Sequence, residues 1–302
     1  MKEFILLIVA LFLLNSCNKD NNKLVWTAIN VNSTGKQGDA HLISKNGKHF
    51  MIDTGQYYYV KRTLLPFLHS KHICYIDSIL ITHPHFDHYG GITELMKSDI
   101  KIGKIYFNIP TKEKMESEWW GGHWKDILYI QEVAKKYHVP IIPIKAGDIY
   151  KLDKDSYFKV LYQYDGEHTP VGKTDINDMS AILMLYHGKN RFLFTGDLNN
   201  KLGGYLAKNA NNIQANILKF PHHGTEGFPP NTFFKKVNPK VVVVPGPATL
   251  WCSKRSIRAR KIVKDNNYTT YVNGFNGNIS VVSDGKSYKI VPEKSSKLIC
   301  PK

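Results

Sequence analysis

Residues 79–92 read ILITHPHFDHYGGI: a short apolar run, a segment rich in histidine, and two adjacent glycines. Residues 79–81 are apolar and largely β-branched, as in a buried strand. Gly90 and Gly91 have no Cβ atom, so the backbone can approach a group that is held in the preceding loop. The stretch therefore predicts a strand, a ligand-holding loop and a helix that begins near Ile92.

Four side chains of metal-ligand type follow the strand with the spacing H-x-H-x-D-H: His83, His85, Asp87 and His88. We expect His83 and His85 to bind one ion, and Asp87 and His88 to face a second ion. Nitrogen and carboxylate ligands suit zinc, with manganese or iron as alternatives. Two ions ~3.5–4 Å apart can share one hydroxide as a nucleophile. The alternative is a polar loop without metal, but this density of ligands at a strand end argues against it.

The composition of the 302-residue chain is that of a globular protein with enough apolar content for a large core. Lys and Arg number 41 against 25 Asp and Glu, which gives a formal charge of +16. Such an excess favours polyanionic partners or an anionic membrane surface. A solvated, lysine-rich surface is the alternative, because the lysines are spread along the chain.

Residues 1–16 have the make-up of a secretory signal peptide, with Lys2 before an unbroken apolar run that is too short to span a bilayer. Residues 14–17, LNSC, resemble the lipobox of bacterial lipoproteins, which implies lipidation of Cys17. Residues 17–23 are then predicted to form a flexible tether. We therefore expect an exported protein, anchored by lipid to a bacterial membrane on the periplasmic or cell-surface side. A buried N-terminal helix is the alternative, but no polar face interrupts the run.

Four cysteines are present: Cys17, Cys74, Cys252 and Cys300. None has C-x-x-C spacing, so the sequence predicts no cysteine zinc site. If Cys17 is acylated, three remain, which leaves room for one disulfide in an exported protein.

Residues 24–302 are predicted to form one domain, because strand-like segments in both halves are each followed by helical segments and no linker separates them. This order favours two sheets packed face to face with helices outside. Residues 269–291 contain Asn-Gly and Asp-Gly pairs and are predicted to form a hairpin or small meander. Residues 118–124, EWWGGHW, form either a lid that stacks bases or sugars or the packing of an insert.

THPHFDHYGG at 82–91 resembles the signature of the metallo-β-lactamase superfamily. The resemblance implies an α/β fold of the αββα type, in which two mixed sheets pack face to face with a dinuclear site at one edge. MIDTG at 51–55 resembles the segment whose aspartate, here Asp53, orients a metal-bound histidine. FLFTGDL at 192–198 implies that Asp197 bridges two divalent metal ions. LKFPHHGT at 218–225 implies His222 as the last ligand of the second ion, with His223 as a substrate contact or proton donor.

The resemblance departs from the family pattern at one ligand of the first ion. Most members place a histidine shortly before the strand that begins near residue 180, but residues 168–183 read HTPVGKTDINDMSAIL. The candidates for the third ligand are therefore Asp175, Asn177 and Asp178, and His168 lies further back.

Other stretches are more specifically similar to the extracellular hydrolase domain of the DNA-uptake channel ComEC and its stand-alone relatives. They are VNSTGKQGDAHLI (31–43), NDMSAILML (177–185) and NGNISVVSDGKSYKI (276–290), and Gly38-Asp39-Ala40 matches a turn of these relatives. The sequence contains no polytopic membrane region, so we do not expect these residues to form a channel.

The resemblance predicts a metal-dependent hydrolase, with a phosphodiester or nucleic acid as substrate and Asp87, Asp197 and His223 as catalytic residues. One alternative is hydrolysis of a β-lactam, lactone or thioester, which a strongly basic surface does not favour. Another is a surface-anchored binding protein whose metal site is degenerate, since one histidine is missing. The membrane is the other expected partner, through the lipid anchor, and no protein partner is inferred.

Overall fold

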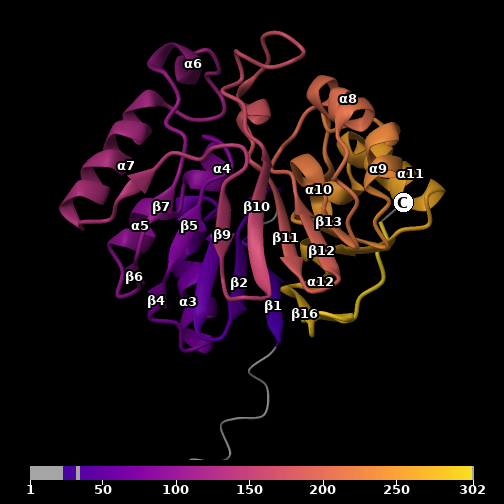
Figure 1. Cartoon of the computed structure of the whole chain (residues 1–302), viewed down its shortest axis with the longest axis horizontal. Coiled ribbons are helices and arrows are strands. Elements are labelled where there is room, and N and C mark those ends of the chain that lie inside the picture. Colours follow the sequence, from indigo (N-terminus) through magenta and orange to yellow (C-terminus); the bar gives the residue numbers. More distant parts are fainter. Residues whose placement is uncertain (1–22, 32–34, 301–302) are drawn as a thin grey trace, which may run out of the picture.

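The computed structural model describes residues 23–31 and 35–300. Two large sheets pack face to face, with helices on their outer faces (Figure 1). The predicted αββα sandwich of two mixed sheets is therefore confirmed. The predicted signal peptide, Cys17 and most of the tether lie outside the described residues.

The first sheet has the order β17-β16-β1-β2-β3-β5-β7-β8. Its strands pair antiparallel from β17 to β3 and parallel from β3 to β8. Their bounds are β1 Leu24–Ala28, β2 His41–Lys45, β3 Lys48–Ile52, β5 Ser78–Leu80, β7 Ile105–Tyr106, β8 Ile141–Ile142, β16 Ile279–Ser283 and β17 Tyr288–Pro292.

The second sheet has the order β15-β14-β13-β12-β11-β10-β9, antiparallel from β9 to β12 and parallel from β12 to β15. Its strands are β9 Ile149–Lys151, β10 Ser156–Tyr162, β11 Ile182–His187, β12 Asn190–Phe194, β13 Ile217–Lys219, β14 Val241–Val244 and β15 Thr269–Val272. A two-stranded sheet of β4 (Tyr75–Ile76) and β6 (Lys101–Ile102) lies apart from both.

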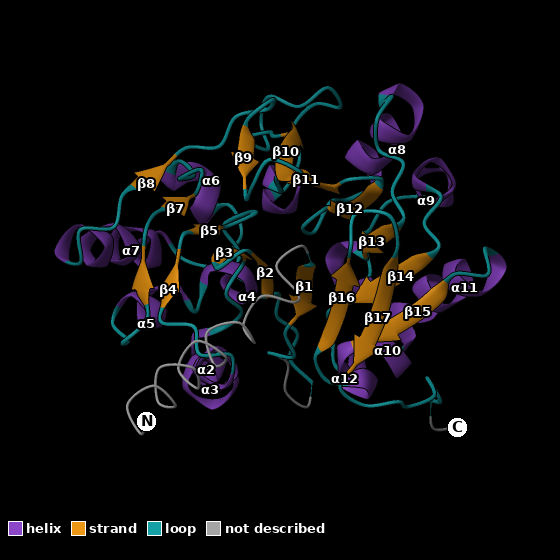
Figure 2. Cartoon of the chain, turned by 60° about the horizontal axis from the view of Figure 1, so that its bottom comes forward, coloured by secondary structure: helices purple, strands orange, loops and turns teal. Residues whose placement is uncertain are grey.

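Helices from the first half of the chain cover the first sheet, and helices from the second half cover the second sheet (Figures 1 and 2). The first group is α2 Tyr57–Tyr59, η1 Val60–Leu64, α3 Leu65–Ser70, α4 Phe86–Tyr89, α5 Ile92–Met96, α6 Lys112–Glu116 and α7 Trp124–Lys136. The second is α8 Asn200–Asn209, η3 Pro221–Gly224, α9 Asn231–Val237, α10 Ala248–Cys252, η4 Lys254–Ser256, α11 Ile257–Asp265 and α12 Asn273–Asn276. The short turn η2 (Ile176–Met179) packs Ile176 and Met179 into the apolar cluster of the first group. No helix in the described part of the chain is both long and apolar enough to cross a membrane.

Three apolar clusters hold these layers together. Aromatic side chains that include Trp26, Phe158 and Phe194 fill the space between the two sheets. Of the two further clusters, one lies between the first sheet and its helices and the other between the second sheet and its helices. Strand β14 is four consecutive valines, all buried, as expected for a parallel strand that is covered on both faces.

The predicted hairpin at residues 269–291 is only half right. β16 and β17 form a hairpin across Asp284-Gly285, but β15 belongs to the other sheet. The Asn273 side chain donates to the carbonyls of Ala28 and Gly277, and Asn276 accepts from the amide of Val272. These bonds close the helical turn α12, which carries the chain from the second sheet to the first.

A disulfide joins Cys252 to Cys300, so the one bridge that the cysteine count left room for is present. It connects α10 to the C-terminal segment across 48 residues of sequence. Cys74 is exposed and free.

The polar loops of the two sheets meet at one edge. The loops that follow β3, β5, β12 and β13 all leave the carboxyl ends of parallel strands. The amide of Ala181 donates to the carbonyl of Thr82 over 3.0 Å, which joins the two sheets at this edge. Sequence segments that lie more than a hundred residues apart thus meet here.

Candidate metal centre

The histidine loop is braced against the loop after β3. Asp53 is held in a left-handed conformation, with φ of 58°, while its amide donates to the carbonyl of Leu80. A Cβ atom on Gly91 would lie 2.4 Å from the carbonyl oxygen of Thr54. The predicted close approach at this glycine therefore serves the packing of the two loops, which fixes the direction of the ligand side chains.

His88 is buried and is oriented through its Nδ1 atom. This atom lies 2.8 Å from Oδ2 of Asp53, which also accepts from the hydroxyl of Thr82. Nδ1–H therefore donates to Asp53, so Nε2 is the nitrogen that faces Asp197, 3.3 Å from its Oδ2 atom. This is the contact that the role predicted for Asp53 requires, because such a partner fixes both the tautomer and the ring of a ligating histidine.

His223 has a similar arrangement on the opposite side of Asp197. Its Nδ1 atom donates to the carbonyl of Pro245 over 2.8 Å. Its Nε2 atom lies 3.2 Å from Oδ2 of Asp87 and 3.2 Å from Oδ2 of Asp197. His222 is partly exposed, and its Nε2 atom lies 4.0 Å from Asp197. The geometry therefore favours His223 for the ligand role that the resemblance gives to His222.

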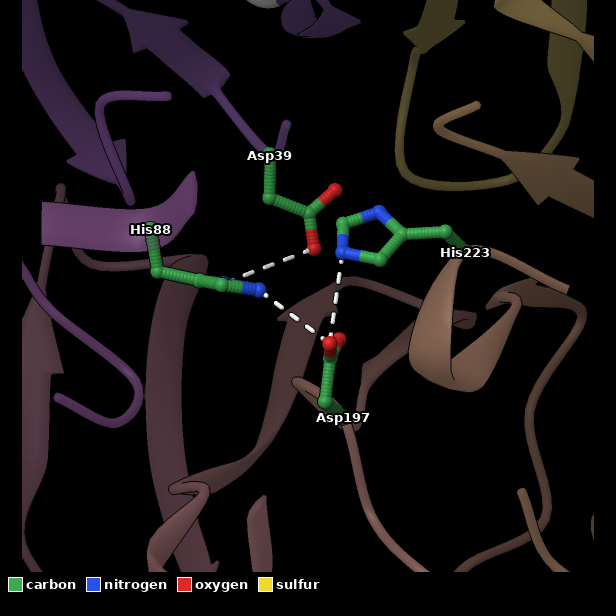
Figure 3. Close-up of side chains that lie close together, drawn as sticks. All are labelled: Asp39, His88, Asp197 and His223. Atoms are coloured by element: carbon green, nitrogen blue, oxygen red, sulfur yellow. Dashed lines mark ion pairs between the residues drawn. The ribbon is translucent and has the colours of Figure 1, made fainter. Parts of the chain in front are cut away.

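A buried group of four side chains could hold a cation (Figure 3): Asp39, His88, Asp197 and His223. One ligand atom from each lies within 4.8 Å of all the others. Nε2 of His88 and Nε2 of His223 are buried and have no hydrogen-bond partner, although carboxylate oxygens lie 3.2–3.3 Å away. Two buried imidazole nitrogens beside carboxylate oxygens suit a divalent cation.

His83 and His85 form the other half of the centre. Nε2 of His83 lies 3.2 Å from Nδ1 of His85, and the His83 and His88 rings are 4.1 Å apart between centroids. Zinc–nitrogen bonds of about 2.0–2.1 Å in a tetrahedral site place two ligand nitrogens at a similar separation, about 3.3 Å. The other ring nitrogen of His83, Nδ1, faces the hydroxyls of Thr82 and Ser180.

The three candidates for the missing ligand lie on or next to η2. Asp178 accepts from the amide of Asn199, and Asp175 accepts from the amide of Asn177. Burial raises the pKa of Asp178 to about 7. The side-chain oxygen of Asn177 is buried and has no hydrogen-bond partner. His168 lies on the surface beside Asp165. The choice among Asp175, Asn177 and Asp178 remains a prediction.

Two residues that sequence reasoning missed as site residues form an ion pair inside the centre. Nζ of Lys219 lies 2.5 Å from Oδ2 of Asp39 and 3.4 Å from Oδ1 of Asp197, and it donates to the carbonyl of Gly196. Both side chains of the pair are fully buried. The available signals are a lysine in the otherwise apolar stretch NILKF and the turn Gly38-Asp39-Ala40, which matches a turn of the ComEC-like relatives.

The charges of these groups depend on one another. Burial alone would raise the pKa of Asp39, but the ammonium of Lys219 and then His223 more than offset it, so the pKa lies below its ordinary value. Burial would also raise the pKa of Asp197, yet His223, His88 and Lys219 hold it well below the ordinary value. Both carboxylates are therefore ionised at neutral pH.

The pKa values of His88 and His223 shift in the opposite direction, upward. Burial lowers the pKa of His88, but the carboxylates of Asp197 and Asp53 raise it to a value well above the ordinary one. For His223, burial is likewise outweighed by Asp197, and the pKa rises to about 10. Without metal, both rings are protonated at neutral pH, and a cation must displace these protons.

Residues 33–243 match the family model described as the Metallo-beta-lactamase superfamily. The chain belongs to this superfamily. A structure of the metallo-beta-lactamase fold protein YhfI from Bacillus subtilis shares the fold, with a TM-score of 0.52 and 13% sequence identity over 83% of this chain and 96% of that chain.

Two curated relatives are longer proteins. ComE operon protein 3 of Bacillus subtilis is 28% identical over 61% of this chain and 22% of its own length. Recombination protein 2 of Haemophilus influenzae is 24% identical over 69% of this chain and 23% of its own length. The chain therefore spans less than a quarter of the length of these relatives. The predicted similarity to competence proteins of the superfamily is confirmed.

We predict that His223→Ala loses one bound ion while His222→Ala retains both. Of these two histidines, only His223 directs its Nε2 atom at both Asp87 and Asp197, and this nitrogen can bind a cation once its proton has left. The adjacent histidine serves as the matched control. Metal content after dialysis, measured by mass spectrometry, gives the stoichiometry of each variant. Loss of an ion from His222→Ala alone would restore the ligand assignment that the resemblance implies.

We also predict that metal binding releases protons at pH 7 and tightens as the pH rises. The raised pKa values of His88 and His223 mean that protons compete with the cation at neutral pH, and for His223, whose pKa is about 10, this competition extends into the alkaline range. Calorimetry of zinc binding in two buffers of different ionisation enthalpy measures the number of protons released. An enthalpy that is independent of the buffer would contradict the protonation states described above.

Proposed function

We propose that this chain is a metal-dependent phosphodiesterase that acts on nucleic acid. The observation that carries the proposal is the pair of adjacent ligand sets, His83 with His85 and His88 with His223, beside the buried carboxylate of Asp197. Such an arrangement fits two divalent cations. When bound, they would polarise a phosphoryl oxygen and lower the pKa of water.

The side chains around this centre have distinct tasks. Asp53 and the carbonyl of Pro245 orient His88 and His223 from behind. Lys219 balances the charge of Asp39 and Asp197, so that both carboxylates stay ionised in a buried site. His222 is partly exposed next to Asp197 and is therefore available to contact substrate, as the resemblance implies for its neighbour.

Charge and aromatic exposure support a nucleic acid as the substrate. The formal charge of +16 favours a polyanion over a neutral β-lactam, lactone or thioester. Trp119 and Trp120 are 83% and 57% exposed, and the Trp120 ring lies 5.1 Å from the His85 ring. Exposed indoles beside a phosphodiester site can stack on bases, with a gain of about 1–3 kcal/mol per base. One relative is named Recombination protein 2, and recombination is a reaction of nucleic acids.

We predict that the purified protein hydrolyses bis(p-nitrophenyl) phosphate and single-stranded DNA, and that a chelator abolishes this activity. His85→Ala should lower the rate by about 100-fold or more, because one ion loses a ligand. His168→Ala should keep the parent rate, since this histidine lies on the surface.

A chromogenic β-lactam serves as the third substrate in the same assay. Hydrolysis of the β-lactam without any phosphodiester turnover would favour the alternative hydrolase. Bound metal with no turnover of any substrate would favour a binding protein with a degenerate site. Full activity of His85→Ala would refute the proposed centre.

We propose further that the protein is exported and anchored to a bacterial membrane by lipid on Cys17. The apolar run of residues 4–14 and the sequence LNSC support this proposal. The disulfide between Cys252 and Cys300 also favours an oxidising compartment.

We expect Cys17→Ala to move the protein from the membrane fraction to the soluble fraction and to abolish incorporation of labelled palmitate. Cys74→Ala is the matched control and should stay in the membrane fraction, because Cys74 is exposed and makes no disulfide. An unchanged distribution and label in Cys17→Ala would refute lipid anchoring at this residue.

A further inference from the structure

Residues 117–123, between α6 and α7, and Trp124 at the start of α7 place their side chains in three different environments. Trp119 and Trp120 are exposed, whereas Trp124 packs against the apolar cluster under the first sheet. Glu118 is 8% exposed, although its neighbours Glu116 and Ser117 are exposed. A buried carboxylate must gain its stabilisation from specific partners.

Glu118 has two such partners, one in each half of the chain. Its Oε2 atom lies 3.0 Å from Nε2 of His85. Its Oε1 atom accepts from the amide of Ile176 over 2.7 Å. One carboxylate therefore connects the histidine loop to Ile176, the first residue of η2. This turn also carries Asn177 and Asp178, two of the three candidates for the missing ligand.

The ring of His85 is enclosed by the same segment. A Cβ atom on Gly121 would lie 2.4 Å from Nε2 of His85, so only glycine lets the chain pass here. The carbonyl of Gly121 accepts from the amide of Phe86, and the Trp120 ring lies beside the imidazole. These contacts leave the His85 ring one orientation, with Nδ1 directed at His83.

The bond to Glu118 also determines which nitrogen carries the proton. A carboxylate accepts only from a protonated nitrogen, so Nε2–H of His85 donates to Glu118. The lone pair is then on Nδ1, 3.2 Å from Nε2 of His83. His85 thus has the same kind of partner on its outer nitrogen that Asp53 provides for His88.

We propose that Glu118 is a positioning residue for the first metal ion. It fixes the tautomer and orientation of His85 and holds η2 at the correct distance from the histidine loop. The proposal rests on the dinuclear centre described above, but it does not depend on which substrate that centre hydrolyses.

The test compares zinc and cobalt binding by the parent, Glu118→Gln, Glu118→Ala and the control Glu116→Gln, which changes an exposed carboxylate at the end of α6. Competition with a chromophoric chelator measures affinity, and mass spectrometry measures stoichiometry at saturating metal. The visible spectrum of the cobalt form reports the ligand field at the first ion. Circular dichroism checks that each variant is folded.

We expect the affinity for one of the two ions to fall by about 10-fold in Glu118→Gln and by up to about 100-fold in Glu118→Ala, the range typical of residues that orient a metal ligand. The amide retains an acceptor for His85 but cannot reproduce both bonds, so its effect is the smaller one. Two ions should still bind at saturating metal, with an altered cobalt spectrum. Glu116→Gln should match the parent.

An affinity within threefold of the parent in both Glu118 variants would overturn the proposal. Permanent loss of one ion at saturating metal would also overturn it, because Glu118 would then be a ligand. A parent protein that binds no metal would overturn both this proposal and the proposed function. A parent that binds two ions but hydrolyses no phosphodiester would contradict only the proposed function and leave the affinity comparison valid.

Discussion

Buried negative charge at the junction of the two sheets is the constraint on which the centre depends. Asp39, Asp53 and Asp197 are at most 2% exposed and lie close to one another. Carboxylates in such surroundings are costly unless cations and hydrogen bonds balance them. Lys219 is a permanent cation within this group, and the protonated imidazoles of His88 and His223 supply the rest when no metal is bound. The carboxylates at this edge of the sandwich are thus balanced by nearby cationic side chains.

The two halves of the chain divide the work at this edge. The first half supplies the histidine loop with its supporting carboxylates, and the second half supplies Asp197, Lys219 and His223. Apolar clusters on both sides of each sheet fix the strands from which these loops leave. The loops themselves can therefore consist largely of polar and glycine residues without loss of position. Rigid strands with variable loops also explain why members of one superfamily can act on different substrates.

The parts of the centre that follow strand ends could be predicted from the sequence, and those that depend on distant contacts could not. His83, His85, Asp87 and His88 form a local pattern, and Asp197 follows a clear apolar run. Glu118 and Lys219 gave weak signals, because each acquires its partner only when segments far apart in the sequence meet. The sequence could not decide which of the adjacent residues His222 and His223 directs its ring at Asp197. Both adopt a left-handed φ, so the alternation of side-chain directions along an extended strand does not apply to them. The fold class was accessible from strand and helix order, but Asn-Gly pairs at 273–277 closed a helical turn instead of a hairpin.

The wide spacing of the ligands along the chain has a consequence for when the protein acquires its ions. The group shown in Figure 3 draws on residues from Asp39 to His223, so it is incomplete until both sheets have formed and docked. Binding of a cation by this group would therefore follow the docking of the two sheets. A chain that crosses a membrane in an unfolded state would complete this step only at its destination. The metal supply of that compartment, rather than the one where the chain is synthesised, would then decide which ions the centre binds.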